Sequence, residues 1–270
     1  MTFLVGPITS VFDVLLAPFG HGWPWFDLVL WPLVGAVIAL VVYKYVSNQK
    51  AIAAAKDRIA LHLYEVRLFP EDLRIVLGST LKILWRNAVY VGHNLLPMAV
   101  MLAPMMLLIT QLVSHYAFAP TPVGEPVVLQ VALDSGRPAS SVQLEVPNGV
   151  TLDAPPVRTA DGHAYFRLRG DVAGDHTLVV RQGSETQTKV WSVGGEARKV
   201  SPLRTDSLEA WLYPGEPALP GDSSFRELRI ATAAQPMHWL PDGEGGILLW
   251  FFALSLLAGF ALAKPMGVTF

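Results

Sequence analysis

Polar side chains interrupt a long apolar stretch in the first half of the chain, and their residue types are ones that can line a functional site. Arg86, Asn87, His93 and Asn94 stand near its beginning, and Gln111 stands further along. Asn87 and Asn94 are seven positions apart, as are Arg86 and His93, so each pair lies nearly in line on a helix. Polar groups at membrane depth are costly and normally face protein or a water-filled cavity. The pattern predicts a polar groove or, alternatively, ordinary satisfaction of these groups near the lipid headgroups.

Four methionines share the same apolar stretch: Met98, Met101, Met105 and Met106. Methionine is flexible and polarisable, which suits an adaptable binding surface, and it is equally common as plain packing. Both interpretations of the methionines stay open at this point.

Catalytic and metal-binding patterns are missing from the sequence. It contains no G-x-S-x-G, Walker A, H-E-x-x-H or G-x-G-x-x-G motif, and it has no cysteine. His163 and His176 are candidates to meet across a hairpin and bind metal, but a third ligand in register is missing, so we read them as exposed strand histidines. We expect a protein that is not an enzyme and that has no metal and no cofactor.

Composition indicates a membrane protein. Hydrophobic residues make up 52% of the 270 residues and charged residues only 16%, below the roughly 25% usual in soluble domains. The net charge of −2 and the absence of a basic patch give no sign of nucleic-acid binding. A helical span needs about 20 apolar residues. Three segments meet this requirement: residues 26–45, 89–116 and 246–263.

The basic residues predict the orientation of these spans. Residues 1–26 contain no Lys or Arg, whereas the 44–92 segment contains eight. Because basic loops stay in the cytoplasm, we expect the hairpin segment 46–88 and the tail 264–270 to be cytoplasmic and the N-terminus to be outside. Residues 1–25 read as an amphipathic segment in the outer interface, with a disordered tail as the alternative.

The 46–88 segment is typical of a helical hairpin. Ser47 or Asn48 is expected to cap a helix that begins near Gln49. Pro70 stops that helix and is expected near the first position of the next one. Each helix carries one apolar stripe, which predicts an antiparallel pair. Gly78 weakens the second helix, so a bend there is an open alternative.

Between the second and third spans, residues 117–242 change character. Short alternating runs at 127–133, 141–146, 163–169, 176–182 and 186–193 read as strands, with a last strand at 226–232. Turn residues separate them. We expect an external, all-β immunoglobulin-like sandwich beside the helical membrane part.

The order of elements resembles the core of the YidC-type membrane protein insertase superfamily. The likeness is closest to its small members, such as the third subunit of the ER membrane protein complex and the archaeal insertase-like proteins. It is carried by "VVYKYVSNQKAIAAAKDRIALHLYEVRLFPEDL" and "NLLPMAVMLAPMMLLITQL". Two features depart from the family: the first span lacks an arginine, and the external segment is a β-domain.

The resemblance implies insertion or folding of membrane proteins through a polar groove that faces the cytoplasm. The implied client groove comprises Arg86, Asn87, His93, Asn94, Gln111, Met98, Met101 and Met105. The implied docking residues of the hairpin are Lys50, Lys56, Arg58, Arg67 and Arg74.

The partners expected from this reading are the lipid bilayer and nascent or other membrane proteins, without nucleic acid. An accessory subunit of a larger membrane complex, which docks partners through the β-domain, is the alternative hypothesis. An N-terminus outside and a sandwich domain suggest the bacterial inner membrane, with the β-domain in the periplasm.

Overall fold

The computed structural model describes residues 5–18, 22–134 and 137–268. The ends of the predicted segments 1–25 and 264–270 therefore lie outside the described residues. The chain separates into two compact units. One comprises Leu30–Met106 and Phe252–Phe270, and the other comprises Met1–Val29 and Leu107–Phe251.

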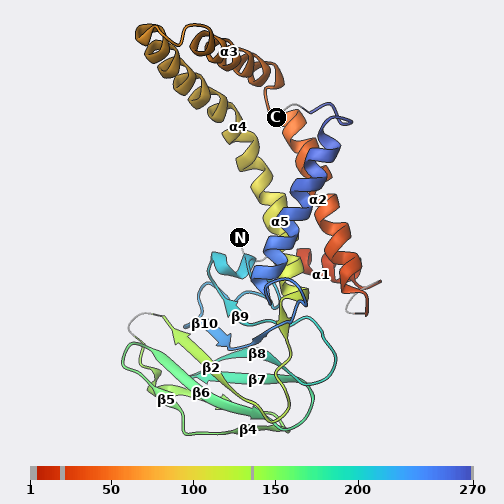
Figure 1. The fold of residues 1–270 in the computed structure, drawn as a ribbon. Coiled ribbons are helices and arrows are strands. Elements are labelled where there is room, and N and C mark those ends of the chain that lie inside the picture. The colour runs from red at the N-terminus through yellow and green to blue at the C-terminus, as the bar shows by residue number, and fades with distance from the viewer. Residues whose placement is uncertain (1–4, 19–21, 135–136, 269–270) are drawn as a thin grey trace. The chain divides into compact units, whose positions relative to one another are not determined.

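Among the described residues, three helices are long and apolar enough to cross a membrane: α2 (Pro24–Val46), α4 (Leu73–Tyr116) and α5 (Glu244–Ala263) (Figure 1). This confirms a helical membrane part. Helix α4 has 44 residues and contains Pro97 and Pro104. The predicted boundary between hairpin and span, at 88/89, falls inside this continuous helix, because residues 84–96 contain neither a proline nor a capping turn.

The first helix of the hairpin begins where the sequence predicts, whereas the second helix begins a few residues later than expected. Helix α3 (Gln49–Leu68) begins after Asn48, whose side chain accepts the Ala51 N–H at 3.0 Å. Pro70 was expected near the first position of α4, and that position is Leu73. Asp72 accepts the backbone N–H groups of Arg74 and Ile75 at 2.9 and 3.3 Å, so the helix begins one residue after this cap.

The helical unit has a small core of its own where four chain segments meet. Leu40, Tyr43, Ile52 and Ala263 are buried there, and Met101 packs against them. Lys44 donates a hydrogen bond of 2.7 Å to the backbone carbonyl of Met266, which holds the residues after α5 against the end of α2. The small core and the Lys44–Met266 hydrogen bond both join residues that are far apart in the sequence, so the helices form one packed unit.

Strands fill the second unit between the spans, and the main ones match the predicted alternating runs. They are β2 (Pro126–Leu133), β3 (Val142–Glu145), β6 (His163–Gly170), β7 (Gly174–Gln182), β8 (Glu185–Val193) and β10 (Phe225–Ile230). Shorter strands join them: β1 (Phe118–Ala119), β4 (Val150–Leu152), β5 (Val157–Arg158), β9 (Leu203–Thr205) and β11 (Ala233–Ala234). This confirms a separate β-domain.

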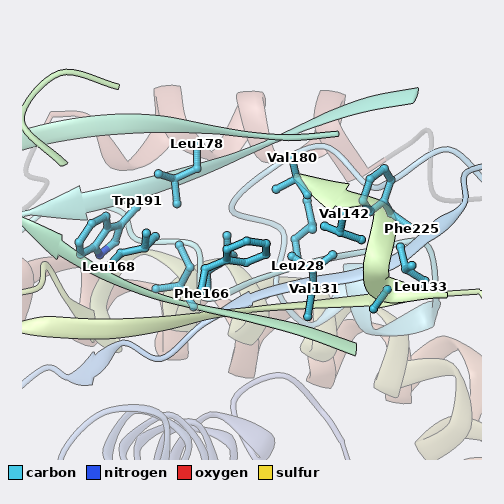
Figure 2. Close-up of a cluster of buried hydrophobic side chains, with 14 of the residues drawn as sticks. Val131, Leu133, Val142, Phe166, Leu168, Leu178, Val180, Trp191, Phe225 and Leu228 are labelled. Carbon is cyan, nitrogen blue, oxygen red and sulfur yellow. The ribbon is translucent and has the colours of Figure 1, made fainter. Parts of the chain in front are cut away.

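Two antiparallel sheets face each other across one core. The larger has the order β4-β6-β2-β10-β9 with β5 beside β6, and the smaller has the order β3-β7-β8. Figure 2 shows Leu178, Val180 and Trp191 of the small sheet above Phe166 and Leu168 of the large one. The inward side of each strand is set by alternation: every second residue of β6 is buried, and β7 buries His176, Leu178 and Val180.

The chain enters and leaves the β-domain at one place. Strand β1 pairs with β11, with Phe118 opposite Ala234 and Ala119 opposite Ala233. This two-residue ribbon lies between the end of α4 and the start of α5. It ties the first and last residues of the domain together.

Helix α1 (Val5–Leu16) belongs to the unit that holds the β-domain. Thr9, Phe12 and Leu16 are buried, while Val11 and Val14 on the other side are exposed. His115 and Lys199 bond to the Asp13 carboxylate at 2.9 and 2.8 Å. The location of α1 at a membrane interface stays a prediction.

Candidate functional site

A cavity of about 470 Å³ opens within the helical unit and is the candidate site. Helices α2, α4 and α5 all line it. The lining residues from α2 are Ala36, Ala39, Leu40 and Tyr43, those from α4 are Met101 and Met105, and those from α5 are Phe252, Ser255, Leu256, Gly259 and Phe260. Nearly all of these groups are apolar, so the site suits an apolar guest.

Small residues create the space. Ala36, Ala39 and Gly259 occupy positions where larger side chains would fill the gap between helices. A Cβ atom added at Gly259 would meet no heavy atom within 4 Å. Small residues are common where membrane helices approach closely. Here, instead, they leave open volume beside bulky Phe252 and Phe260.

A polar link lies beside the apolar lining. Tyr43 is one of the lining residues, and its hydroxyl donates a hydrogen bond to Asn94 Oδ1. Asn94 Nδ2 donates to the Tyr90 carbonyl at 2.7 Å. Both amide atoms of Asn94 are therefore engaged within the helical unit.

The structure brings some of the predicted groove residues to this cavity. Met101 and Met105 line it directly, and Asn94 is joined to it through Tyr43. His93 and Met98 are exposed on α4 and are not part of the lining.

Three other predicted groove residues lie elsewhere. Asn87 is exposed. Arg86 lines a separate hollow of about 400 Å³ with His62, Leu81, Lys82 and Trp85. Gln111 belongs to the other compact unit, where it is buried and its side-chain N–H donates to Thr9 Oγ1 at 3.3 Å. A single groove shared by all eight residues stays a prediction.

The predicted docking residues of the hairpin are all exposed: Lys50, Lys56, Arg58, Arg67 and Arg74. Between the two helices of the hairpin, Ser79 is buried and donates a 2.6 Å hydrogen bond to Glu65, which also contacts His62 at 2.9 Å. The bonds from Ser79 and His62 hold the pKa of Glu65 below its ordinary value. This contact fixes α3 against α4 and leaves the basic residues facing outward.

The two strand histidines do not meet across a hairpin. His163 lies on β6 of the large sheet, and His176 lies on β7 of the small sheet. His176 is buried, contrary to the expectation of an exposed residue, because its Nε2 bonds to the Val172 carbonyl at 2.8 Å and its ring packs near Trp191. Within residues 5–18, 22–134 and 137–268, no group of three His, Asp or Glu side chains is placed to hold a metal ion.

Comparisons with known proteins add no family assignment. No protein-family model, curated protein or solved structure matches this chain. The geometry of the cavity is therefore the basis for any functional conclusion.

Sequence reasoning missed most of the lining residues, among them Tyr43, Ser255 and Gly259. In the sequence, Tyr43 was assigned only to the end of the first span. A tyrosine hydroxyl within an apolar segment usually has a hydrogen-bond partner, and this was the available signal. Ser255 and Gly259 are two small residues four positions apart in the third span. This spacing indicates a helix face that lacks bulky side chains, and it can be recognised in the sequence.

Proposed function

We propose that the chain is an insertase-like membrane protein that assists the insertion or folding of other membrane proteins. The observation that carries this proposal is the open apolar cavity of about 470 Å³ that residues of α2, α4 and α5 line. A cavity with this lining accepts an apolar segment by van der Waals packing, which is the contact that joins helices within a bilayer. The resemblance to the YidC-type superfamily supports the same function, although it implies a polar groove whereas the lining of this cavity is apolar.

The lining explains how different clients would be accepted. Met101 and Met105 have flexible, polarisable side chains that adapt to different shapes. Ser255 and Tyr43 are the lining residues whose side chains carry a polar group. A client segment would therefore be held by packing, and the site would have low sequence specificity.

The hairpin is proposed as the element that receives the client or a partner. Its exposed basic residues, such as Lys56, Arg58 and Arg67, offer charge to an acidic or anionic surface. The proposed setting is the bacterial inner membrane, with the N-terminus outside and the hairpin and C-terminus in the cytoplasm. The β-domain would then lie in the periplasm.

An immunoglobulin-like topology is proposed for the β-domain. Constant-type immunoglobulin domains place strands A, B, E and D in one sheet and C, F and G in the other. If β2, β3, β4, β6, β7 and β8 are read as strands B to G, the sheets become D-E-B and C-F-G. Strand β10 then takes the position of strand A beside β2.

Photo-crosslinking tests the proposal. A photoreactive residue at Ser255 faces the cavity, whereas one at Leu257 of the same helix is 67% exposed and does not line it. With ribosome-bound nascent chains of a single-span membrane protein and reconstituted vesicles, we expect adducts to the nascent chain from Ser255 at about five times the yield from Leu257 or more. Equal yields, or adducts to lipid alone at Ser255, would contradict the proposal.

The alternative function, an accessory subunit of a larger complex, is favoured by one contact. Both amide atoms of Asn94 bond within the chain, to Tyr43 and to Tyr90, so this predicted groove residue has a structural role. In an accessory subunit, a photoreactive residue at Ser255 would capture one constant partner in native membranes, whether or not translation is active.

A further inference from the structure

Helix α4 carries basic residues and no acidic ones. Its 44 residues include Arg74, Lys82 and Arg86 but no Asp or Glu. Lys82 and Arg86 are four positions apart, so their side chains lie on the same side of the helix and repel each other. In the part of the chain that the structure describes, no carboxylate forms an ion pair with either of them. This pair of cations is therefore available to an anion from outside the chain.

The two cations line one hollow beside α3. Lys82 and Arg86 surround it together with Leu81 and Trp85 of α4 and His62 of α3, and its volume is about 400 Å³. None of these five residues is acidic. The ammonium, guanidinium and indole groups among them are all hydrogen-bond donors. The hollow therefore suits an anion that has several acceptor oxygens.

Glu65 belongs to a neighbouring hollow of about 420 Å³, which Lys82 also lines. Its carboxylate is already engaged, because Ser79 donates to Oε2 at 2.6 Å and the His62 ring contacts the same oxygen at 2.9 Å. Hydrogen bonds from Ser79 and His62 are the main reason for the lowered pKa of Glu65, and the charge of Lys82 contributes less. Glu65 therefore does little to compensate the charges of Lys82 and Arg86.

The hollow lies where the hairpin meets the membrane-spanning part of α4. Arg86 is the last Lys, Arg, Asp or Glu of the helix, and the residues from Asn87 to Tyr116 contain none. Leu81 and Trp85 are 68% and 67% exposed. Exposed tryptophan is typical of the headgroup layer, because its ring is apolar while its N–H needs a polar partner. Two cations beside two exposed apolar side chains favour a ligand that is itself amphipathic.

We propose that this hollow binds the phosphate headgroup of an anionic phospholipid from the leaflet next to the hairpin. Arg86 donates two parallel N–H groups to phosphate oxygens, and Lys82 adds a point charge. Leu81 and Trp85 contact the glycerol and the first methylene groups of the acyl chains. Basic pockets beside membrane helices hold such headgroups in other proteins. The inference needs the membrane-spanning helices of the structure and does not depend on the proposed insertase function.

Native mass spectrometry of the full chain in mild detergent tests the proposal. The probes are phosphatidylglycerol, which is anionic, and phosphatidylcholine, which is zwitterionic. We expect the wild type to bind phosphatidylglycerol at least about tenfold more tightly than phosphatidylcholine, and Lys82→Gln/Arg86→Gln to lose this preference. The control Lys50→Gln/Arg67→Gln removes the same charge from two exposed hairpin positions and should keep it. No preference in the wild type, or the same result for both variants, would overturn the proposal.

Competition separates a lipid site from a site for a soluble anion. Inorganic phosphate and a short single-stranded RNA carry the same charged group, but neither has acyl chains to place against Leu81 and Trp85. At matched ionic strength, neither should displace phosphatidylglycerol from the wild type. Displacement by either one would assign the hollow to soluble phosphates and would contradict the proposal.

A second measurement locates the hollow relative to the bilayer. Because the chain has no cysteine, Leu81→Cys and Leu68→Cys can each carry one fluorescent label, at the hollow and at the end of α3. Both leucines are exposed, so the label should not disturb the fold. In vesicles with nitroxide-labelled phosphatidylglycerol headgroups, quenching at position 81 should be at least about twice that at position 68, since attraction to the headgroups falls off within a Debye length. Adding Lys82→Gln/Arg86→Gln should remove the difference. Equal quenching at both positions without these substitutions would count against the lipid site.

Discussion

The hydroxyl group of Tyr43 donates a hydrogen bond to the side-chain oxygen of Asn94, which joins α2 to α4 across 51 positions of the sequence. Residues this far apart cannot meet through local structure. The bond therefore reports the packing of the helical unit, and it lies at the wall of the candidate cavity.

The energy of this bond is measurable by a double-mutant cycle. Tyr43→Phe and Asn94→Leu each remove one partner, and we expect a coupling energy of about 0.5–1.5 kcal/mol in the free energy of unfolding, the range for single hydrogen bonds in proteins and between membrane helices. Unfolding in mixed micelles would supply the values. His93→Leu is the control, since His93 is the exposed neighbour and should change stability by less than about 0.5 kcal/mol. A coupling energy of zero would show that the bond is not formed.

Lys189 in the β-domain forms a buried ion pair with Glu216, and its ammonium group also donates to the Ser201 carbonyl at 2.6 Å. Burial lowers the pKa of Lys189, while the Glu216 carboxylate opposes this effect. Removing one partner of a buried pair leaves the other charge uncompensated, so Lys189→Met should destabilise the domain by about 3–5 kcal/mol. Urea unfolding followed by tryptophan fluorescence provides the measurement.

The double variant Lys189→Met/Glu216→Gln is the control for that experiment. The glutamine that replaces Glu216 carries no charge and still offers an oxygen to the Val190 N–H, which Glu216 accepts at 2.8 Å in the wild type. The double variant should recover more than half of the lost stability. If stability does not recover, the loss in Lys189→Met comes mainly from the packing of the lysine side chain and not from the unpaired charge of Glu216.

The Glu185 carboxylate makes the β-domain sensitive to acid. Burial alone would raise its pKa, but hydrogen bonds from Ser223 and Ser224, including the Ser224 backbone N–H at 2.9 Å, outweigh burial and lower the pKa to about 2. The unfolded chain has an ordinary glutamate pKa near 4.5, so it binds a proton first as the pH falls. The stabilisation is complete above about pH 5 and is lost between about pH 4.5 and pH 2.

This pH dependence should shrink when the carboxylate is removed. In Glu185→Gln, the difference in unfolding free energy between pH 6 and pH 3 should be smaller than in the wild type by about 1 kcal/mol, after allowance for solvent screening. Thermal unfolding followed by near-ultraviolet circular dichroism at both pH values would show it. An identical pH dependence in both proteins would be evidence against the bonds to Ser223 and Ser224.

The orientation of the chain is testable with single cysteines at exposed positions. Lys50 is exposed on the hairpin and Thr186 is exposed on β8. In intact cells, an impermeant thiol reagent should label Thr186→Cys and should label Lys50→Cys only after the membrane is opened, because eight basic residues favour a cytoplasmic 44–92 segment. The opposite labelling pattern would invert the proposed topology.

Sequence patterns predicted the main elements because those elements are long and periodic. The alternation in His163–Gly170 and Gly174–Gln182 specifies which side of each strand is buried, and it was sufficient to place them. Strands β5 and β11 have two residues each, too few to show any period, and they form only because neighbouring strands offer hydrogen bonds. The weakness expected at Gly78 does not interrupt α4, where the adjacent Ser79 is held by Glu65.

The candidate site was less predictable because it depends on contacts between distant segments. The polar residues of α4 predicted a polar groove, whereas the cavity is formed mainly by small and apolar residues from three helices. No local pattern shows that Ala39, Met101 and Gly259 share one space. In the other unit, Gln111 is held by Thr9 of α1, a contact across 102 positions.

The most direct test of the account is an insertion assay with the cavity filled. Gly259→Leu projects a side chain into the cavity, where no heavy atom lies within 4 Å of the new Cβ, and Ala253→Leu adds similar bulk to an exposed position of the same helix. With vesicles reconstituted from each protein and a single-span client made by cell-free translation, wild type and Ala253→Leu should insert the client equally. Gly259→Leu should reduce insertion by about tenfold. Equal insertion by all three proteins, or no insertion above empty vesicles by the wild type, would contradict the central claim that this cavity receives the client.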